Sequence, residues 1–99
     1  MKRIAVDDLP DDPLAAAGLV HQHWLSHIEQ QLEGGLDVAI TVPAADHTHR
    51  KWRRAVTAGL ARKHTPRRVN MVAGEGAALD ATVAYLSKAP GVTGQYLET

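Results

Sequence analysis

The sequence lacks the residues that support disulfide and thiolate chemistry, and it has few aromatic residues. It contains no cysteine, which excludes disulfide bonds and metal sites built on thiolates. It also contains no phenylalanine, and its only aromatic side chains of the Trp and Tyr type are Trp24, Trp52, Tyr85 and Tyr96. A folded core must therefore be built mainly from alanine, valine, leucine and isoleucine.

Long apolar runs are absent as well. No stretch approaches the roughly 20 consecutive apolar residues that a membrane-spanning helix needs, so we expect no membrane association. The opening MKRIAVDDLPDD has no apolar run behind its charges, which argues against a usual secretory signal. We therefore expect a cytoplasmic protein. A hydrophobic share of 44% in 99 residues predicts one folded domain that spans residues 1–99.

Neither sign of charge is in excess, yet the charges are unevenly placed. The 11 Lys and Arg residues balance the 11 Asp and Glu residues. Aspartates gather near the beginning, at Asp7, Asp8, Asp11 and Asp12. Basic residues gather in the middle, at Arg50, Lys51, Arg53, Arg54, Arg62, Lys63, Arg67 and Arg68. Such asymmetry is found in proteins that bind a charged partner or a second copy, and also on solvated surfaces.

The hydrophobic pattern predicts four strands that alternate with three helices. The strands are 2–6, 36–42, 69–73 and a last short one within TGQYLET, and the helices are 13–33, 49–63 and about 76–88. Asp12 followed by Pro13 is typical of a helix start, and Gly34 of a helix end. The order βαβαβαβ predicts an α/β fold with a four-stranded, mainly parallel sheet and right-handed crossovers.

The second half of the chain resembles a known family. VNMVAGEG, a helix that ends in VAYLSKA, and GVTGQYLET are similar to the last third of a short-chain dehydrogenase/reductase. The matching residues are Val69, Asn70, Val72, Ala84, Leu86, Ser87, Thr93, Gly94 and Gln95. Helix 49–63, with Thr57, Leu60 and Ala61, resembles the catalytic helix of that family. The resemblance implies a truncated Rossmann-like domain that corresponds to the back half of a full enzyme.

The sequence departs from the family where the family carries its chemistry. The family's glycine-rich turn binds the cofactor pyrophosphate, whereas strand 2–6 is followed by DDLPDD, whose carboxylates would repel phosphate. Asp46 and Arg50 occupy the positions of the family's Tyr-x-x-x-Lys pair, and no tyrosine precedes Tyr85. An aspartate, with a reference pKa of ~3.9, holds no proton to donate near neutrality. Val42 and Pro43 lie where the catalytic serine is expected.

We therefore predict no catalytic residue, no cofactor and no enzymatic activity for the chain alone. His23 and His27 lie one helical turn apart, together with His21, and could share a metal ion with Asp46 or its neighbours. A polar helix flank is the simpler interpretation, so we predict no metal site. Tyr85 is interpreted as a core residue of the last helix.

The basic helix 50–63 leaves one alternative open, a small module that binds an anion or a nucleic acid through Arg50, Arg53 and Arg54. Trp52 lies on the apolar face of this helix and fits a core position better than a base-stacking one. The net charge of zero also removes the long-range attraction of a DNA-binding protein. We favour a solvated face, or one that meets the aspartate-rich front of a second copy, and do not expect nucleic acid as a partner.

Two features predict association with another chain. Strand 2–6 lies in the middle of the family's sheet, so here it would become an exposed edge. The resemblance also implies that the first two helices build an oligomer interface, with Trp24, Ile28, Trp52 and Val56 as contributors, although some of these must face the sheet instead. We expect a homodimer, or a silent or regulatory subunit bound to a full-length dehydrogenase.

Overall fold

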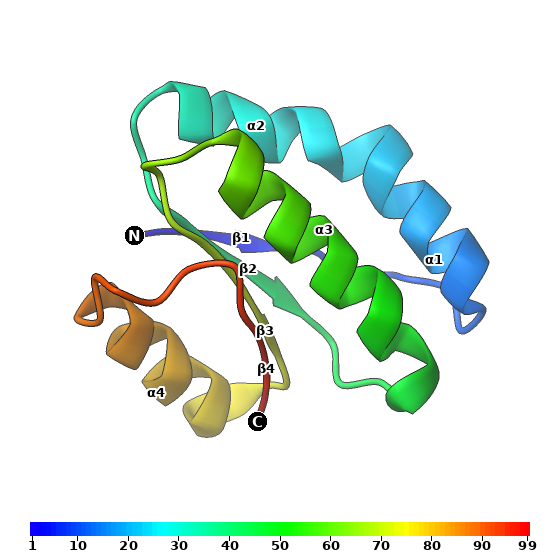
Figure 1. Cartoon of the computed structure of the whole chain (residues 1–99). Helices are drawn as coiled ribbons and strands as arrows, with labels where there is room; N and C mark the ends of the chain where they lie inside the picture. Colours follow the sequence, from blue (N-terminus) through cyan, green and yellow to red (C-terminus); the bar gives the residue numbers. More distant parts are fainter.

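Four parallel strands form the centre of the molecule in the order β1-β2-β3-β4 (Figure 1). The computed structural model describes all 99 residues. The strands are β1 Lys2–Ala5, β2 Val38–Val42, β3 Val69–Ala73 and β4 Tyr96–Glu98. Their register aligns Ile4 with Ile40, and Ile40 with Met71. The predicted α/β fold is confirmed, with a sheet that is parallel throughout.

The helices follow the predicted order. The first predicted helix is one path of three segments, namely α1 Pro13–Leu19, the π-helical η1 Val20–Trp24 and α2 Leu25–Glu33. A short 3₁₀ turn, η2 His47–His49, precedes α3 Arg50–Lys63, and α4 is Gly76–Ser87. The predicted helix start is confirmed, because the Asp12 carboxylate accepts a hydrogen bond of 2.8 Å from the Ala15 N–H. None of the helices combines the length and the apolar character that a membrane crossing requires.

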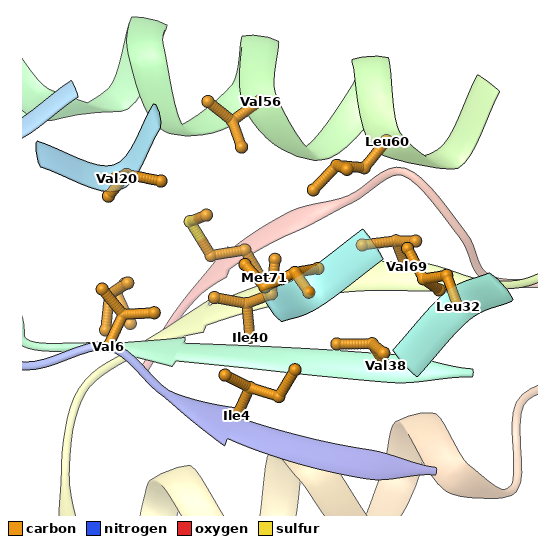
Figure 2. Packing of buried hydrophobic residues seen from close by; sticks show 13 residues of the cluster. Ile4, Val6, Val20, Leu32, Val38, Ile40, Val56, Leu60, Val69 and Met71 are labelled. Atoms are coloured by element: carbon orange, nitrogen blue, oxygen red, sulfur yellow. The ribbon is translucent and has the colours of Figure 1, made fainter. Parts of the chain in front are cut away.

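The helices cover both faces of the sheet, and this arrangement corrects one prediction. Segments α1 to α3 lie on one face, where Ile40 and Met71 meet Val56 and Leu60 (Figure 2). Helix α4 lies on the other face, where Leu79 and Leu86 pack on Val72. Each connection leads to the next strand in the same direction across the sheet. Because α4 lies on the opposite face from the helices of the first two connections, the β3-α4-β4 crossover has the opposite handedness. The prediction of right-handed crossovers throughout is therefore wrong. The physical reason is that both faces of β3 are buried. Segments α1 to α3 cover one face, and α4 covers the other.

Two large apolar residues lie on the surface, and one of them, Tyr85, was predicted to belong to the core. Leu14 is 83% exposed and Tyr85 is 60% exposed. The buried stripe of the first helical path begins at Ala16 on α1 and Val20 on η1 instead, and α4 buries Leu79 and Leu86. The interpretation of Tyr85 as a core residue is wrong because apolar residues on α4 extend beyond the face that the sheet can cover.

Strand β1 is an edge strand, as predicted. Its one partner in the sheet is β2. Ile4 and Val6 are buried under the helices, whereas Lys2, Arg3 and Ala5 are exposed. The sheet therefore ends in a strand that buries one face and leaves its outer edge open.

Candidate functional site

An open apolar groove runs between the η1–α2 part of the first helical path and α3. Its volume is about 390 Å³, within the range of small-molecule and peptide sites. The residues that line it come from η1, α2 and α3, and they are His21, Leu25, Glu29, Trp52, Ala55, Val56, Gly59, Leu60 and Lys63. Small residues at positions 55 and 59 leave the space open, because neither side chain reaches across to α2. The groove is therefore a concave apolar surface that this chain does not fill.

The orientation of Trp52 in this groove is fixed by hydrogen bonds. The Trp52 Nε1–H donates to Nδ1 of His49 at 3.0 Å. Nδ1 of His49 is then an acceptor, so Nε2 carries the proton and donates to the backbone oxygen of Asp11 at 2.9 Å. His49 is buried, and this chain of bonds connects α3 with the loop that precedes α1. The half-buried Trp52 ring is consequently held in place as a wall of the groove.

An ion pair closes one end of the groove. Glu29 on α2 accepts a bond of 2.8 Å from Lys63 on α3, and it lies 3.3 Å from Nε2 of His64. The hydrogen bond from Lys63, helped by the nearby His64 ring, lowers the pKa of Glu29 despite an opposing effect of burial. The same contact raises the pKa of Lys63. The ion pair joins the two helices that form the groove.

The four predicted interface residues are divided between the groove and the core. Trp24 and Trp52 are half-buried, and Trp52 lines the groove. Ile28 is fully buried in the core, and Val56, which is 8% exposed, belongs to the core and also lines the groove. Ile28 therefore offers no surface to another chain in this fold. Leu25 and Gly59 also line the groove and were not predicted, although a small residue on an otherwise apolar helix face is a visible signal.

The three arginines of the alternative anion site do not form a surface cluster. Arg50 donates to Glu98 at 2.9 Å, and Arg54 is exposed. Arg53 is 2% exposed and donates to the backbone oxygen of Pro43 at 2.9 Å and to the Tyr96 hydroxyl at 3.1 Å. Its guanidinium lies 5.5 Å from the Trp52 ring centroid and 5.8 Å from that of Tyr96. The prediction that Arg53 faces an anion in solvent is wrong, because its side chain is enclosed by aromatic rings inside the fold.

The histidines of the first helix do not gather with other ligand-type side chains. The structure contains no group of three or more His, Cys, Asp or Glu residues placed to hold one metal ion. His21 and His23 are exposed on η1, and His21 lines the groove.

The sequence motif that resembles the dehydrogenases joins the start of β3 to the loop between α4 and β4 through hydrogen bonds. The buried Asn70 donates through Nδ2 to the Val92 oxygen at 2.9 Å, and its Oδ1 accepts from the Gln95 N–H at 3.1 Å. The Thr93 hydroxyl accepts from the Val69 N–H at 3.0 Å. The Gly94 N–H donates to the Val69 oxygen at 2.7 Å. These contacts bring the Val-Asn and Thr-Gly-Gln phrases together in the fold.

The comparison with protein families gives a match over almost the whole chain. Residues 4–99 match the family model described as Short chain dehydrogenase-like protein. The chain belongs to the short-chain dehydrogenase-like family. The predicted resemblance is thereby confirmed, and it covers a fragment of the family's domain. No curated protein and no solved structure shows a significant match to the chain.

In this short-chain dehydrogenase-like protein, the positions of the expected catalytic pair carry structural contacts. Asp46 begins η2, where its carboxylate accepts from the Thr48 N–H at 3.0 Å and from the Thr48 hydroxyl. These two bonds lower the pKa of Asp46, so the group is a carboxylate at neutral pH. Arg50 pairs with Glu98. Asp46 therefore serves as a helix cap, and Arg50 links α3 to β4.

A second, smaller cleft lies at the carboxyl ends of β2 and β3, on the α4 side. It holds about 170 Å³ and is lined by Asp7, Thr41, Val42, Pro43, Gly74, Glu75 and Leu79. Small-molecule sites usually measure roughly 300–1,000 Å³, and two of the seven lining residues are acidic. In this short-chain dehydrogenase-like chain the strand ends therefore present a narrow, negatively charged cleft.

Proposed function

We propose that this chain is a non-catalytic member of the short-chain dehydrogenase-like family that acts by association. Its leading form is a homodimer, and the other form is a silent or regulatory subunit of a full-length dehydrogenase. The proposal assigns no cofactor and no metal to the chain. Both forms make the role of the protein structural or regulatory.

The chemistry of the candidate site supports the non-catalytic part of the proposal. A proton donor is needed where Asp46 stands as an ionised cap, and an unengaged cation is needed where Arg50 is paired with Glu98. The cleft at the strand ends carries Asp7 and Glu75, and carboxylates oppose the binding of a pyrophosphate.

The apolar groove is the main support for the proposal that the chain associates with a second copy. A groove of about 390 Å³ with an oriented tryptophan in its wall is an anchor site of the kind found at the centre of protein interfaces. Helices of a second chain fit such a groove through side chains at helical spacing. The occupant that we propose is the corresponding helix pair of a second copy.

Gly59 provides a test of the groove that does not disturb the fold. A Cβ at this helical glycine would meet nothing within 4 Å, and replacing a helical glycine adds roughly 0.5–1 kcal/mol of helix propensity. We expect size-exclusion chromatography with light scattering to give the wild type at least twice its 10.7 kDa chain mass. Gly59→Glu places a carboxylate in the groove and should lower that mass.

Gly18→Glu is the matched control, because Gly18 is also a helical glycine with open space around it and does not line the groove. The control should associate like the wild type. A wild type that runs as a monomer at every concentration, or equal masses for the two glutamate variants and the wild type, would count against the groove.

Cofactor binding is tested separately. We expect isothermal titration with NAD(P)H to give no heat of binding and the purified chain to leave alcohols and ketones unchanged. Tight binding of the nucleotide, or turnover by the isolated chain, would refute the non-catalytic assignment. Co-purification with a full-length dehydrogenase from the native cell tests the silent-subunit form.

A further inference from the structure

The outer edge of β1 offers unsatisfied backbone groups in a defined pattern. The N–H of Lys2 donates to the Asp37 oxygen at 2.7 Å, and the N–H of Val6 donates to the Thr41 oxygen at 2.8 Å. Backbone groups in a strand point alternately to its two sides. The N–H and C=O groups of the odd-numbered residues, Arg3 and Ala5, therefore point away from β2, where the sheet has no further strand. Such an edge can accept a strand from another chain.

The sequence of this edge is complementary to itself in the antiparallel direction. Residues 2–8 read KRIAVDD, with two cations before and two anions after an apolar centre at Ala5. When two copies pair antiparallel about Ala5, Arg3 lies opposite Asp7 of the second copy. Ile4 then lies opposite Val6 of the second copy, and Lys2 lies beside Asp8. Opposite charges and apolar side chains that face each other across an antiparallel ladder stabilise the pairing.

Other registers and directions lose this complementarity. Pairing about Ile4 sets Arg3 opposite Ala5 and Lys2 opposite Val6, so the cations lack partners. Pairing about Arg3 sets two arginines opposite each other, which is unfavourable. Parallel pairing places the basic end of one strand beside the basic end of the other. The charges therefore specify one direction and one register.

The side chains are placed as this pairing requires. Arg3 points to the α4 face, where it donates to Asp80 at 2.7 Å. Asp7 lines the cleft on that same face, so both partners of the Arg3–Asp7 pair emerge on one side of the combined sheet. Ile4 and Val6 point to the other face and are 4% and 1% exposed. Asp8 has a φ of 57°, a left-handed conformation that turns the backbone away immediately after Asp7.

We propose that β1 pairs antiparallel with β1 of a second copy about a two-fold axis at Ala5, joining two sheets into one continuous sheet. The interface lies on the sheet edge, away from the groove between α2 and α3. It extends the proposed function by a second self-association surface and does not depend on the first. A chain that uses both surfaces reaches a mass above that of a dimer.

The test isolates the edge by working with the Gly59→Glu chain, in which the groove carries a charge. We expect G59E to have twice the chain mass in light scattering. The two-fold axis repeats the contact between residue 3 and residue 7 two times in each dimer. Adding Arg3→Glu places a carboxylate opposite Asp7 at both contacts, and adding Asp7→Lys places an ammonium group opposite Arg3 at both. The repulsion between like charges should therefore make both double variants monomeric. An equimolar mixture of the two double variants pairs every charge with its opposite. Native mass spectrometry should then find the mixed dimer.

Asp80→Asn in the same background is the control, because it removes the Arg3–Asp80 ion pair without changing the edge. This control should remain dimeric. A monomeric G59E chain, double variants that remain dimeric, or a mixture that forms no mixed dimer would each overturn the β1 pairing. If G59E keeps the full wild-type mass while the edge variants lower it, the groove assignment fails and the β1 pairing stands.

Discussion

A single buried amide accounts for much of the family signature in this chain. Asn70 is fully buried, and both ends of its side chain are bonded to the turn before β4. Asn70→Leu removes both bonds and leaves the Val92 oxygen and the Gln95 N–H without partners. Since an unsatisfied buried polar group costs about 1–3 kcal/mol, we expect a loss of roughly 2–4 kcal/mol in the free energy of unfolding. Urea denaturation measures it.

The exposed Gln95 side chain provides the comparison for Asn70. Its Nε2 makes one long bond of 3.3 Å to the Thr93 oxygen, so Gln95→Ala should change the unfolding free energy by less than about 1 kcal/mol. If the two substitutions cost the same, Asn70 does not hold the turn together through its hydrogen bonds. The signature would then need another explanation.

Arg53 shows at the residue scale why a charge pattern does not reveal a binding site. Its neighbours in the sequence, Arg50 and Arg54, are at least partly solvated, whereas Arg53 is buried without a carboxylate partner. Backbone and hydroxyl acceptors and two aromatic rings surround its guanidinium instead. The sequence contains Trp52 and Tyr96 but gives no sign that they meet at Arg53, because 43 positions separate Arg53 from Tyr96.

At the scale of elements, the strands and helices follow from local patterns. The continuous apolar segment of β2 is buried at every position, as a parallel strand with both faces covered requires. The Asp12–Pro13 start fixes α1, and β3 spans the predicted residues 69–73. These features depend on periodicity and capping, which act over a few residues and can therefore be read from the sequence.

The features that were not predicted depend on contacts between distant elements. The side of the sheet that α4 covers is determined by the packing of Leu79 and Leu86 on Val72, and the apolar spacing of α4 alone fits either side. The groove arises because positions 55 and 59 of α3 leave a space opposite Leu25 on α2. Which apolar residues face the sheet and which face that space depends on the rotation of each helix. That rotation is fixed by tertiary packing.

At the scale of the whole molecule, two carboxylates join separate elements and make stability depend on pH. Glu29 joins α2 to α3 through Lys63. Asp37, just before β2, accepts bonds from the Arg68 N–H at 2.8 Å and from its Nε at 3.2 Å. Burial alone would raise the pKa of Asp37, but these bonds outweigh it and lower the pKa. Arg68 also donates to the Leu86 and Ala89 oxygens at the end of α4, so Asp37 connects three elements.

The sign of the pH dependence follows from the lowered pKa values. A carboxyl group with a lower pKa in the folded than in the unfolded state binds fewer protons when folded, so it stabilises the fold at higher pH. The contributions should be complete above the ordinary values of 4.5 for Glu29 and 3.8 for Asp37. They should disappear as the pH falls through the lowered folded values. We therefore expect the wild type to lose stability progressively below about pH 4.5.

Variants with a neutral side chain at these positions should lose less stability than the wild type as the pH falls. At pH 7, Asp37→Asn should cost about 2 kcal/mol, as expected for hydrogen bonds to a charged group, and Glu29→Gln roughly 0.5–1 kcal/mol. As the pH falls through the lowered folded pKa values, each variant should approach the wild type, because the wild-type carboxyl group is then protonated as well. Glu33→Gln, at a nearby position that makes no ion pair, is the control and should follow the wild-type curve. Denaturant midpoints at several pH values measure all four chains. Parallel curves for wild type and D37N would mean that the Asp37–Arg68 contact does not join the layers as an ion pair.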